Sequence, residues 1–132
     1  MRLRHKVEIV AACAAVPCLL ELFPATRVLA WIRRVPRRRG DAIGPARLAH
    51  HVDRLLARAR GPWHYTCLRR ASVLALLLRR EGRDAEVCFG VRRAADGALD
   101  AHAWLRCGGE EPFLERRDVS GFERLERPAA ER

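Results

Sequence analysis

The hydrophobic pattern of this chain changes its period at Gly82. Before this glycine, Ala71, Leu74 and Leu78 follow Cys67 at the spacing of one helix face. After it, apolar and polar residues alternate in short runs between turn residues, which is typical of β-strands. Helices followed by a meander of strands predict an α+β domain. A length of 132 residues is enough for one such domain with a buried core.

Three strands are expected in the second half of the chain. Asp96-Gly97 is a typical hairpin turn, and Gly108-Gly109 can form a second one. The runs on either side of these turns predict strands over 85–91, 101–106 and 112–115. From Arg124 onward the chain is rich in charge and contains Pro128, so we expect a frayed tail there.

Three helical segments are expected before the sheet. The apolar stretch 7–23 contains Pro17, so we expect its helix to break near that residue. Gly44-Pro45 can begin a second helix, because proline suits the first helical position. The predicted buried face of this helix holds Leu48, Val52, Leu55, Leu56 and Ala59. Thr66 is a good N-cap residue for the third helix, so Cys67 is expected in its first turn.

Positive charge is concentrated in the first half of the chain. Residues 1–60 hold 13 basic and 4 acidic side chains, whereas residues 61–132 hold 13 and 12. The run from Arg33 to Arg39 is interpreted as an exposed basic turn, either merely solvated or used for docking. We therefore divide the chain into an N-terminal helical, basic docking segment (1–44), a core (45–126) and a frayed tail (127–132).

The number of cysteines is odd, which argues against a disulfide framework. The five are Cys13, Cys18, Cys67, Cys88 and Cys107. No two of them form a C-x-x-C pair, so a zinc site is not indicated, and no metal or cofactor is expected. This usage suits a reducing cytoplasm. The first apolar stretch makes a poor secretory signal or membrane span, since Glu8 and Glu21 interrupt it.

Cys67 is the strongest candidate for a reactive residue. At the start of a helix, unpaired N–H groups and the positive end of the helix dipole favour an anion. The thiolate is the nucleophilic form of cysteine. A buried cysteine that only fills space is the alternative interpretation, but the position at a helix start favours a nucleophile.

His102 lies on the second expected strand and has candidate carboxylate partners. If Gly108-Gly109 form a tight turn, His102 faces Glu115, and facing Cβ atoms are about 5 Å apart. A carboxylate at that distance can accept the imidazole N–H and set its tautomer. Asp118 has the opposite parity and needs a bulge to reach the histidine, and Asp100 is only two residues along the same strand. We rank Glu115 first and Asp118 second, with a solvated Glu115 as the alternative.

Cys67, His102 and Glu115 together make a Cys-His-acid site for acyl transfer. The histidine takes the thiol proton and later protonates the leaving amine. Water then completes hydrolysis, whereas an amine completes transamidation. The backbone N–H of Cys67, which points out of the helix start, can supply one oxyanion-hole donor.

Four short motifs stand out in the second half of the chain. They are Cys67-Leu68-Arg69-Arg70-Ala71, Arg80-Glu81-Gly82, Phe89-Gly90-Val91 and Ala101-His102-Ala103-Trp104-Leu105. Together they resemble the transglutaminase-like leader peptidases of lasso-peptide biosynthesis, over roughly residues 45–126. The resemblance implies a transglutaminase-like, papain-like core and a cysteine peptidase that cuts the leader from a ribosomally made precursor. It implies Cys67 as nucleophile and His102 as base, while the usual acid is an aspartate where this chain has Glu115.

The resemblance also implies partners. In that family an asparagine-synthetase-like cyclase closes the ring after cleavage, and a leader-recognition domain is either fused to the peptidase or separate. A chain of 132 residues leaves no room for the fused domain, so a separate recognition protein is expected to present the precursor peptide. The N-terminal apolar and basic segment is the expected docking place, and peripheral contact with a membrane stays open.

Two alternatives accompany this interpretation. The same fold supports amide transfer or cleavage of an unrelated peptide. A net charge of +10 also suits a non-catalytic protein that binds nucleic acid or an anionic membrane. The basic run lacks the interleaved aromatic residues of single-strand binders, so no nucleic-acid partner is expected.

Overall fold

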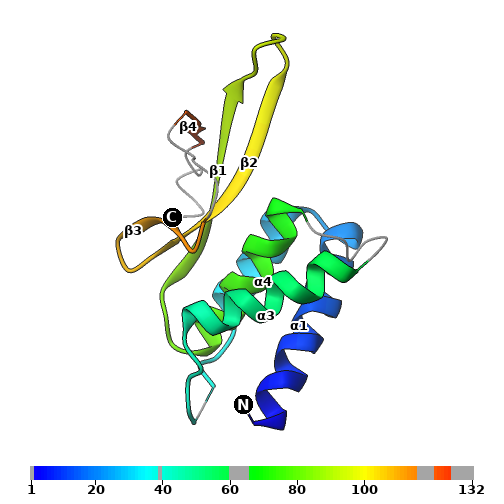
Figure 1. Ribbon diagram of the computed structural model, residues 1–132, viewed down its shortest axis with the longest axis vertical. Helices are drawn as coiled ribbons and strands as arrows, with labels where there is room; N and C mark the ends of the chain where they lie inside the picture. Colours follow the sequence, from blue (N-terminus) through cyan, green and yellow to red (C-terminus); the bar gives the residue numbers. More distant parts are fainter. Residues whose placement is uncertain (1, 39, 60–65, 116–120, 126–132) are drawn as a thin grey trace.

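The computed structural model describes residues 2–38, 40–59, 66–115 and 121–125. These residues form helices and an antiparallel sheet, so the predicted α+β fold is confirmed (Figure 1). The helices are α1 (Leu3–Leu22), α2 (Ala25–Arg33), α3 (Pro45–Arg58) and α4 (Cys67–Arg80). The strands are β1 (Ala85–Arg93), β2 (Leu99–Cys107), β3 (Glu110–Phe113) and β4 (Glu123–Arg124).

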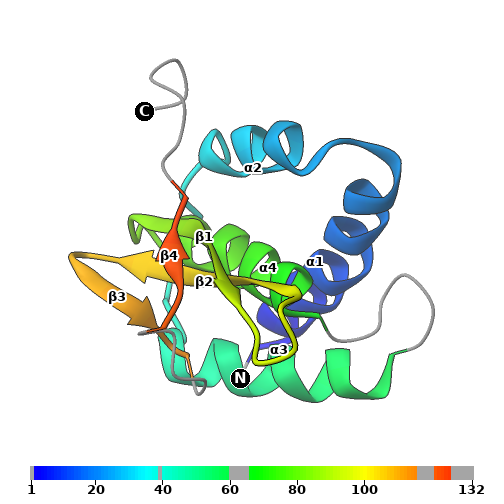
Figure 2. The same ribbon diagram turned by 90° about the horizontal axis from the view of Figure 1, so that it is seen from above.

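Helix α4 is the central helix of the molecule. The other three helices pack against it, and β1 and β2 lie against its remaining side. Figure 2 shows α4 in the middle of the other helices, with the sheet crossing over it. Leu74, Leu77 and Leu78 of α4 are almost completely buried in this core. Close packing along its length therefore holds the helix that begins with Cys67 in one position.

The sheet has the strand order β3-β2-β1-β4 and two different faces. Ala103 and Leu105 of β2 join the main core with the helices. Trp104 packs instead with Phe122, which precedes β4, in a second cluster. His102 leaves β2 on the same face as Trp104, because successive side chains of a strand alternate.

Helix α1 differs from its prediction, because it continues through Pro17 instead of breaking there. A proline inside a helix removes one backbone hydrogen bond. Pro17 is nevertheless buried together with Ile9, Ala12 and Val16 on the inner face of α1. Tertiary packing of that face therefore outweighs the local cost. In the described part of the chain, neither α1 nor another helix combines the length and the apolar character that crossing a membrane requires.

Two smaller differences concern α2 and α3. The apolar stretch before the basic run forms α2, which the sequence pattern did not predict. In α3, Leu48, Val52 and Leu56 are buried as predicted, but Leu55 is 37% exposed. The helix ends at Arg58, so Ala59 is its C-cap residue. The buried stripe of α3 is narrower than predicted, and among the described residues the helix packs mainly against α1 and α4.

The strand boundaries also differ in part from the prediction. The turn at Asp96-Gly97 is present, with the backbone N–H of Ala94 donating to the carbonyl of Ala98 at 2.8 Å. β3 covers residues 110–113 rather than 112–115. Arg124 of β4 pairs with Gly90 of β1 and so belongs to the sheet rather than to a frayed tail. Leu125 is held as well, because its backbone N–H donates to the carbonyl of Phe89 at 2.8 Å. Residues 126–132 of the predicted tail lie outside the described residues.

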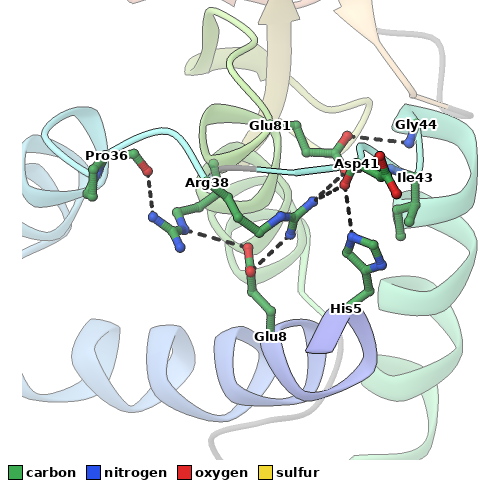
Figure 3. Close-up of polar contacts among 9 residues, drawn as sticks. His5, Glu8, Pro36, Arg38, Asp41, Ile43, Gly44 and Glu81 are labelled. Atoms are coloured by element: carbon green, nitrogen blue, oxygen red, sulfur yellow. Dashed lines mark hydrogen bonds and ion pairs between the residues drawn. The ribbon is translucent and has the colours of Figure 1, made fainter. Parts of the chain in front are cut away.

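Arg38, in the basic segment between α2 and α3, is held by the protein's own acidic groups. Its guanidinium lies 2.9 Å from Glu8 of α1 and 3.2 Å from Glu81 after α4 (Figure 3). Only 11% of the Arg38 side chain is exposed. The prediction of an exposed basic turn is therefore wrong at Arg38, although Arg34 and Arg37 are exposed. Arg39 lies outside the described residues.

Further polar contacts extend this arrangement into a buried polar cluster. It consists of His5, Glu8, Arg38, Arg80 and Glu81 and the backbone groups that they bind. Nε2 of His5 donates to the carbonyl of Asp41 at 2.9 Å, and Glu81 accepts the backbone N–H of Ile43 at 2.8 Å (Figure 3). Arg80 donates to the carbonyl of Pro36 at 2.6 Å. The cluster ties α1 and the segment before α3 to the C-terminal end of α4.

Candidate active site

Cys67 is the first residue of α4. Thr66 caps the helix, because its hydroxyl oxygen accepts the backbone N–H of Arg69 at 3.2 Å. The predicted helix start is therefore confirmed. The Cys67 side chain is half-buried against the main core. Trp63-His64-Tyr65, predicted to form the loop before Cys67, lies outside the described residues.

His102 and Glu115 are in direct contact. Nε2 of His102 lies 3.2 Å from Oε2 of Glu115, and the two side chains are only 4% and 10% exposed. A carboxylate can only accept a hydrogen bond, so Nε2–H is the donor. The predicted contact is present, while Asp118 lies outside the described residues. Asp100 pairs instead with Arg92 at 3.1 Å.

The β2–β3 hairpin has a different register from the one predicted. Gly108-Gly109 do form the tight turn, with Cys107 opposite Glu110. The register then shifts by one residue, so that Leu105 faces Phe113. A shift of one residue exchanges the faces of all later side chains in a strand. Continued in this register, Glu115 would point away from His102.

Leu114 returns Glu115 to the face of His102. This residue follows the end of β3 and has a φ of 57°. That left-handed conformation is uncommon for residues other than glycine, and it changes the direction of the chain. The prediction that Glu115 is the direct cross-strand partner of His102 is therefore wrong. Glu115 contacts His102 from the segment after β3.

The second ring nitrogen of His102 is available for chemistry. Nδ1 is buried and has no hydrogen-bond partner within the described residues. Because Nε2 carries the proton donated to Glu115, Nδ1 has a free lone pair and is the basic atom of the ring. No hydrogen bond joins Nδ1 to the sulfur of Cys67 in this part of the chain. The structure thus brings His102 and Glu115 together, but not His102 and Cys67. Catalytic hydrogen bonds often shorten only when substrate binds.

Aromatic rings surround His102. Its ring centroid lies 6.0 Å from that of Trp104 and 5.5 Å from that of Phe122. Trp104 donates from Nε1 to Glu111 at 2.9 Å. Gly90 is opposite His102 in β1, and a Cβ atom there would overlap the Trp104 ring. The roles of Phe122 and Glu111 were not predicted, since no local spacing relates them to β2.

Cys13, Cys88 and Cys107 are buried, whereas Cys67 and Cys18 are half-buried. Burial raises the pKa of Cys13 to about 11 and, together with the nearby Glu111 carboxylate, that of Cys88 to about 11. Burial also raises the pKa of Cys107. These three thiols therefore stay protonated and unreactive near neutral pH. All five cysteines are described and free, and among the described residues no group of three ligating side chains could hold a metal ion.

A family comparison matches residues 12–127 of the chain to the transglutaminase-like superfamily. The match includes Cys67, His102 and Glu115. The chain belongs to the transglutaminase-like superfamily. Neither the curated proteins nor the solved structures compared with it gave a match.

Members of the transglutaminase-like superfamily are generally cysteine peptidases and acyltransferases. A cysteine at a helix start and a buried histidine–carboxylate pair are the groups that such chemistry needs. The match begins within α1, and the predicted division at residue 44 into docking segment and core stays a prediction.

Proposed function

We propose that this transglutaminase-like protein is a cysteine peptidase that removes the leader peptide from a ribosomally synthesised lasso-peptide precursor. The observation that carries the proposal is the buried His102–Glu115 contact in a chain whose α4 begins with Cys67. The choice of substrate is supported by the motifs around Cys67 and His102, which resemble those of lasso-peptide leader peptidases. The odd number of cysteines, which suits a reducing compartment, supports a cytoplasmic reaction.

In the proposed mechanism, Nδ1 of His102 takes the proton of the Cys67 thiol, and the sulfur attacks the carbonyl carbon of the scissile peptide bond. A backbone N–H at the start of α4 stabilises the oxyanion. The imidazolium then protonates the leaving amine, and water, activated by the same histidine, releases the acyl group from sulfur. Glu115 holds the Nε2–H tautomer and stabilises the imidazolium in both steps.

Incubation with a candidate precursor peptide and its recognition protein tests this function. We expect one cut between leader and core, detected by mass spectrometry. Cys67→Ala should abolish the cut without changing thermal unfolding, because the side chain is small and only half-buried. Cleavage by the Cys67→Ala variant would exclude a cysteine mechanism. An intact precursor after incubation with the wild-type protein would exclude this substrate.

Two partners belong to the proposal: a separate leader-recognition protein and an asparagine-synthetase-like cyclase that uses the product. We place the recognition protein on a groove between α1 and α3, because Arg38 of the basic turn is occupied internally. The groove encloses a cavity of about 260 Å³. It is lined by Lys6, Ile9, Val10, His51, Arg54, Leu55 and Arg58.

The apolar part of this docking surface lies on α1. Leu3, Val7 and Val10 follow one another along its outer face and are 75%, 58% and 53% exposed. The inner face of α1 is packed in the core, and apolar side chains that stay exposed on the outer face of a helix are typical of a contact surface for a partner. An apolar stripe of a partner fits this outer face.

The charge around the groove supports an acidic partner. The side chains of Lys6, Arg54 and Arg58 make no ion pair within the described residues. The pKa of His51 at the same groove is lowered, first by burial and then by neighbouring positive charges that include Arg54 and Lys6. An amphipathic helix with an apolar stripe and acidic flanks is therefore the occupant that we propose, since it matches both features.

Charge reversal tests the docking surface. Lys6→Glu, Arg54→Glu and Arg58→Glu together should weaken binding of the recognition protein at least about 10-fold, without slowing cleavage at saturating partner. Reversal of the exposed Arg34 and Arg37 is the control. A larger loss of binding in the Arg34 and Arg37 control would show that the recognition protein docks on the basic turn instead. Binding to phosphatidylglycerol vesicles that the triple variant loses, with partner binding unchanged, would assign the groove to a membrane.

Amide transfer is the second candidate function, favoured by the acyltransferases within the superfamily. It uses the same acyl-enzyme but ends with an amine instead of water. Adding a primary amine during turnover distinguishes the two reactions. A product mass that includes the amine would support transfer, whereas only a free carboxylate supports hydrolysis.

A further inference from the structure

We infer that Arg70 is a positioning residue that links the helix of Cys67 to the carboxylate of Glu115. The inference rests on the proposed roles of Cys67, His102 and Glu115, but its contacts involve no substrate. Arg70 lies three residues after Cys67 in α4. It is only 6% exposed, and arginine is rarely buried so fully unless it is paired.

The guanidinium of Arg70 has two partners from different parts of the chain. Nε lies 2.7 Å from Oδ1 of Asp53 in α3, and Nη2 lies 3.4 Å from Oδ2. Nη2 also donates to the carbonyl oxygen of Leu114 at 2.7 Å. Arg70 therefore joins α4, α3 and the segment after β3. The planar fork of donors makes this possible, and the single ammonium of a lysine could not hold both partners in the same way.

Leu114 is the residue whose backbone conformation decides where Glu115 lies. Its φ of 57° is unfavourable for a leucine, so surrounding contacts must hold it. The pairing of β3 ends before it, at Phe113. The charge-assisted hydrogen bond from Arg70 acts directly on the Leu114 carbonyl. Arg70 thereby keeps Glu115 within reach of His102.

Loss of Arg70 should act on chemistry through Glu115. Leu114 would be free to relax toward a commoner conformation, and the carboxylate would move away from Nε2 of His102. The imidazole would then lose its tautomer control and the charge that stabilises its protonated form. A purely structural Arg70–Asp53 pair would change the free energy of unfolding but not the pH at which Cys67 reacts.

Alkylation of Cys67 by iodoacetamide tests the inference on the full chain without a substrate. The modified Cys67 peptide is quantified by mass spectrometry across a range of pH. Arg70→Met should slow modification near neutral pH by about 10- to 100-fold, as expected for a misplaced catalytic group. The low-pH limb of the profile of alkylation rate against pH should move to higher pH, because the thiolate–imidazolium pair of Cys67 and His102 loses the Glu115 carboxylate that stabilises it.

Arg69→Met is the matched control for this experiment. Arg69 is the preceding residue in α4, and its guanidinium pairs with Glu21 at 2.7 Å, where the Glu21 side chain is 54% exposed. Its loss should leave the alkylation profile unchanged. An effect of Arg69→Met as large as that of Arg70→Met would overturn the inference.

A double-mutant cycle with Glu115→Gln separates positioning from stability. Because Arg70 acts through Glu115, Arg70→Met should slow alkylation by less than about 3-fold once the carboxylate is gone. An equal loss in both backgrounds would overturn the inference. If Arg70→Met does not fold, Arg70→Lys and Asp53→Asn complete the same cycle. A coupled cycle without any precursor cleavage would reject the leader-peptidase function and retain the positioning role.

Discussion

Two buried histidines at different places in this fold make a useful comparison. His5 and His102 are 3% and 5% exposed. Each is bonded through Nε2, and each has an Nδ1 without a hydrogen-bond partner in the described part of the chain. His5 donates to the neutral carbonyl of Asp41, whereas His102 donates to the carboxylate of Glu115. A carboxylate stabilises an imidazolium more strongly than a neutral carbonyl does, so the charge of the partner, rather than burial, marks the candidate base.

The same contrast extends to the two ends of α4. At its C-terminal end, Glu81 and Arg38 face one another within the buried polar cluster and hold segments together. At its N-terminal end, Cys67 is half-buried and is the first residue of the helix. Arg38 and Glu81 therefore hold the fold together at the C-terminal end of α4. Arg70 and Glu115 instead belong to the surroundings of the candidate site near its N-terminal end.

The largest difference is expected between the two histidines. His102→Ala should abolish cleavage as completely as Cys67→Ala, a loss of about 10⁴ or more, because base and nucleophile act as one unit. His5→Ala should leave kcat within about 3-fold and lower only the melting temperature. Alanine at Cys13, Cys18, Cys88 or Cys107 should also be tolerated. Turnover by the His102 variant at the wild-type rate would remove this histidine from the mechanism.

The two glutamates should differ nearly as much. Glu115→Gln keeps the shape but removes the charge beside His102, so we expect cleavage to slow by about 10³- to 10⁴-fold. Glu81→Gln should change turnover of the folded protein by less than about 3-fold. Asp118→Asn should slow cleavage by less than about 10-fold. A larger loss in the Asp118 variant would transfer the role of the acid to that residue.

Arg38 provides a test at the structural end of α4. Arg38→Met leaves Glu8 and Glu81 without their shared cation, and breaking a buried pair of this kind should lower the free energy of unfolding by about 2–4 kcal/mol. Urea unfolding measures the change. Arg34→Met, at an exposed position of the same segment, should change stability by less than about 0.5 kcal/mol. Equal effects of the two substitutions would show that the cluster contributes nothing specific.

The smallest expected effect separates the buried thiols from Cys67. The pKa values of Cys13 and Cys88, about 11, lie above the ordinary value of 9.0. The neutral thiols therefore stabilise the fold below pH 9, and this contribution is lost as pH rises toward 11. We expect a loss of about 1–2 kcal/mol for each of the two thiols between pH 8 and pH 10.5 in urea unfolding. Replacing both residues by alanine should flatten this dependence, and an unchanged slope would contradict the burial of these thiols.

The sequence by itself determined the features that depend on neighbouring residues. The start of α4 at Cys67 follows from the capping oxygen of Thr66, which acts only three residues ahead. The hairpins at Asp96-Gly97 and Gly108-Gly109 follow from the backbone freedom of glycine at positive φ, and Gly97, Gly108 and Gly109 have φ of 86°, 58° and 86°. Such local signals have the same meaning in many folds, so they are readable without one.

Only the tertiary structure decided the features that depend on distant partners. Pro17 stays inside a helix because of packing against the core, and Arg38 is buried because Glu8 and Glu81, far apart in sequence, converge on it. Glu115 was predicted to meet His102 directly across a regular hairpin. It meets it after a register shift and a left-handed residue, and the energy that holds that arrangement comes from contacts outside the hairpin, which no spacing within it encodes.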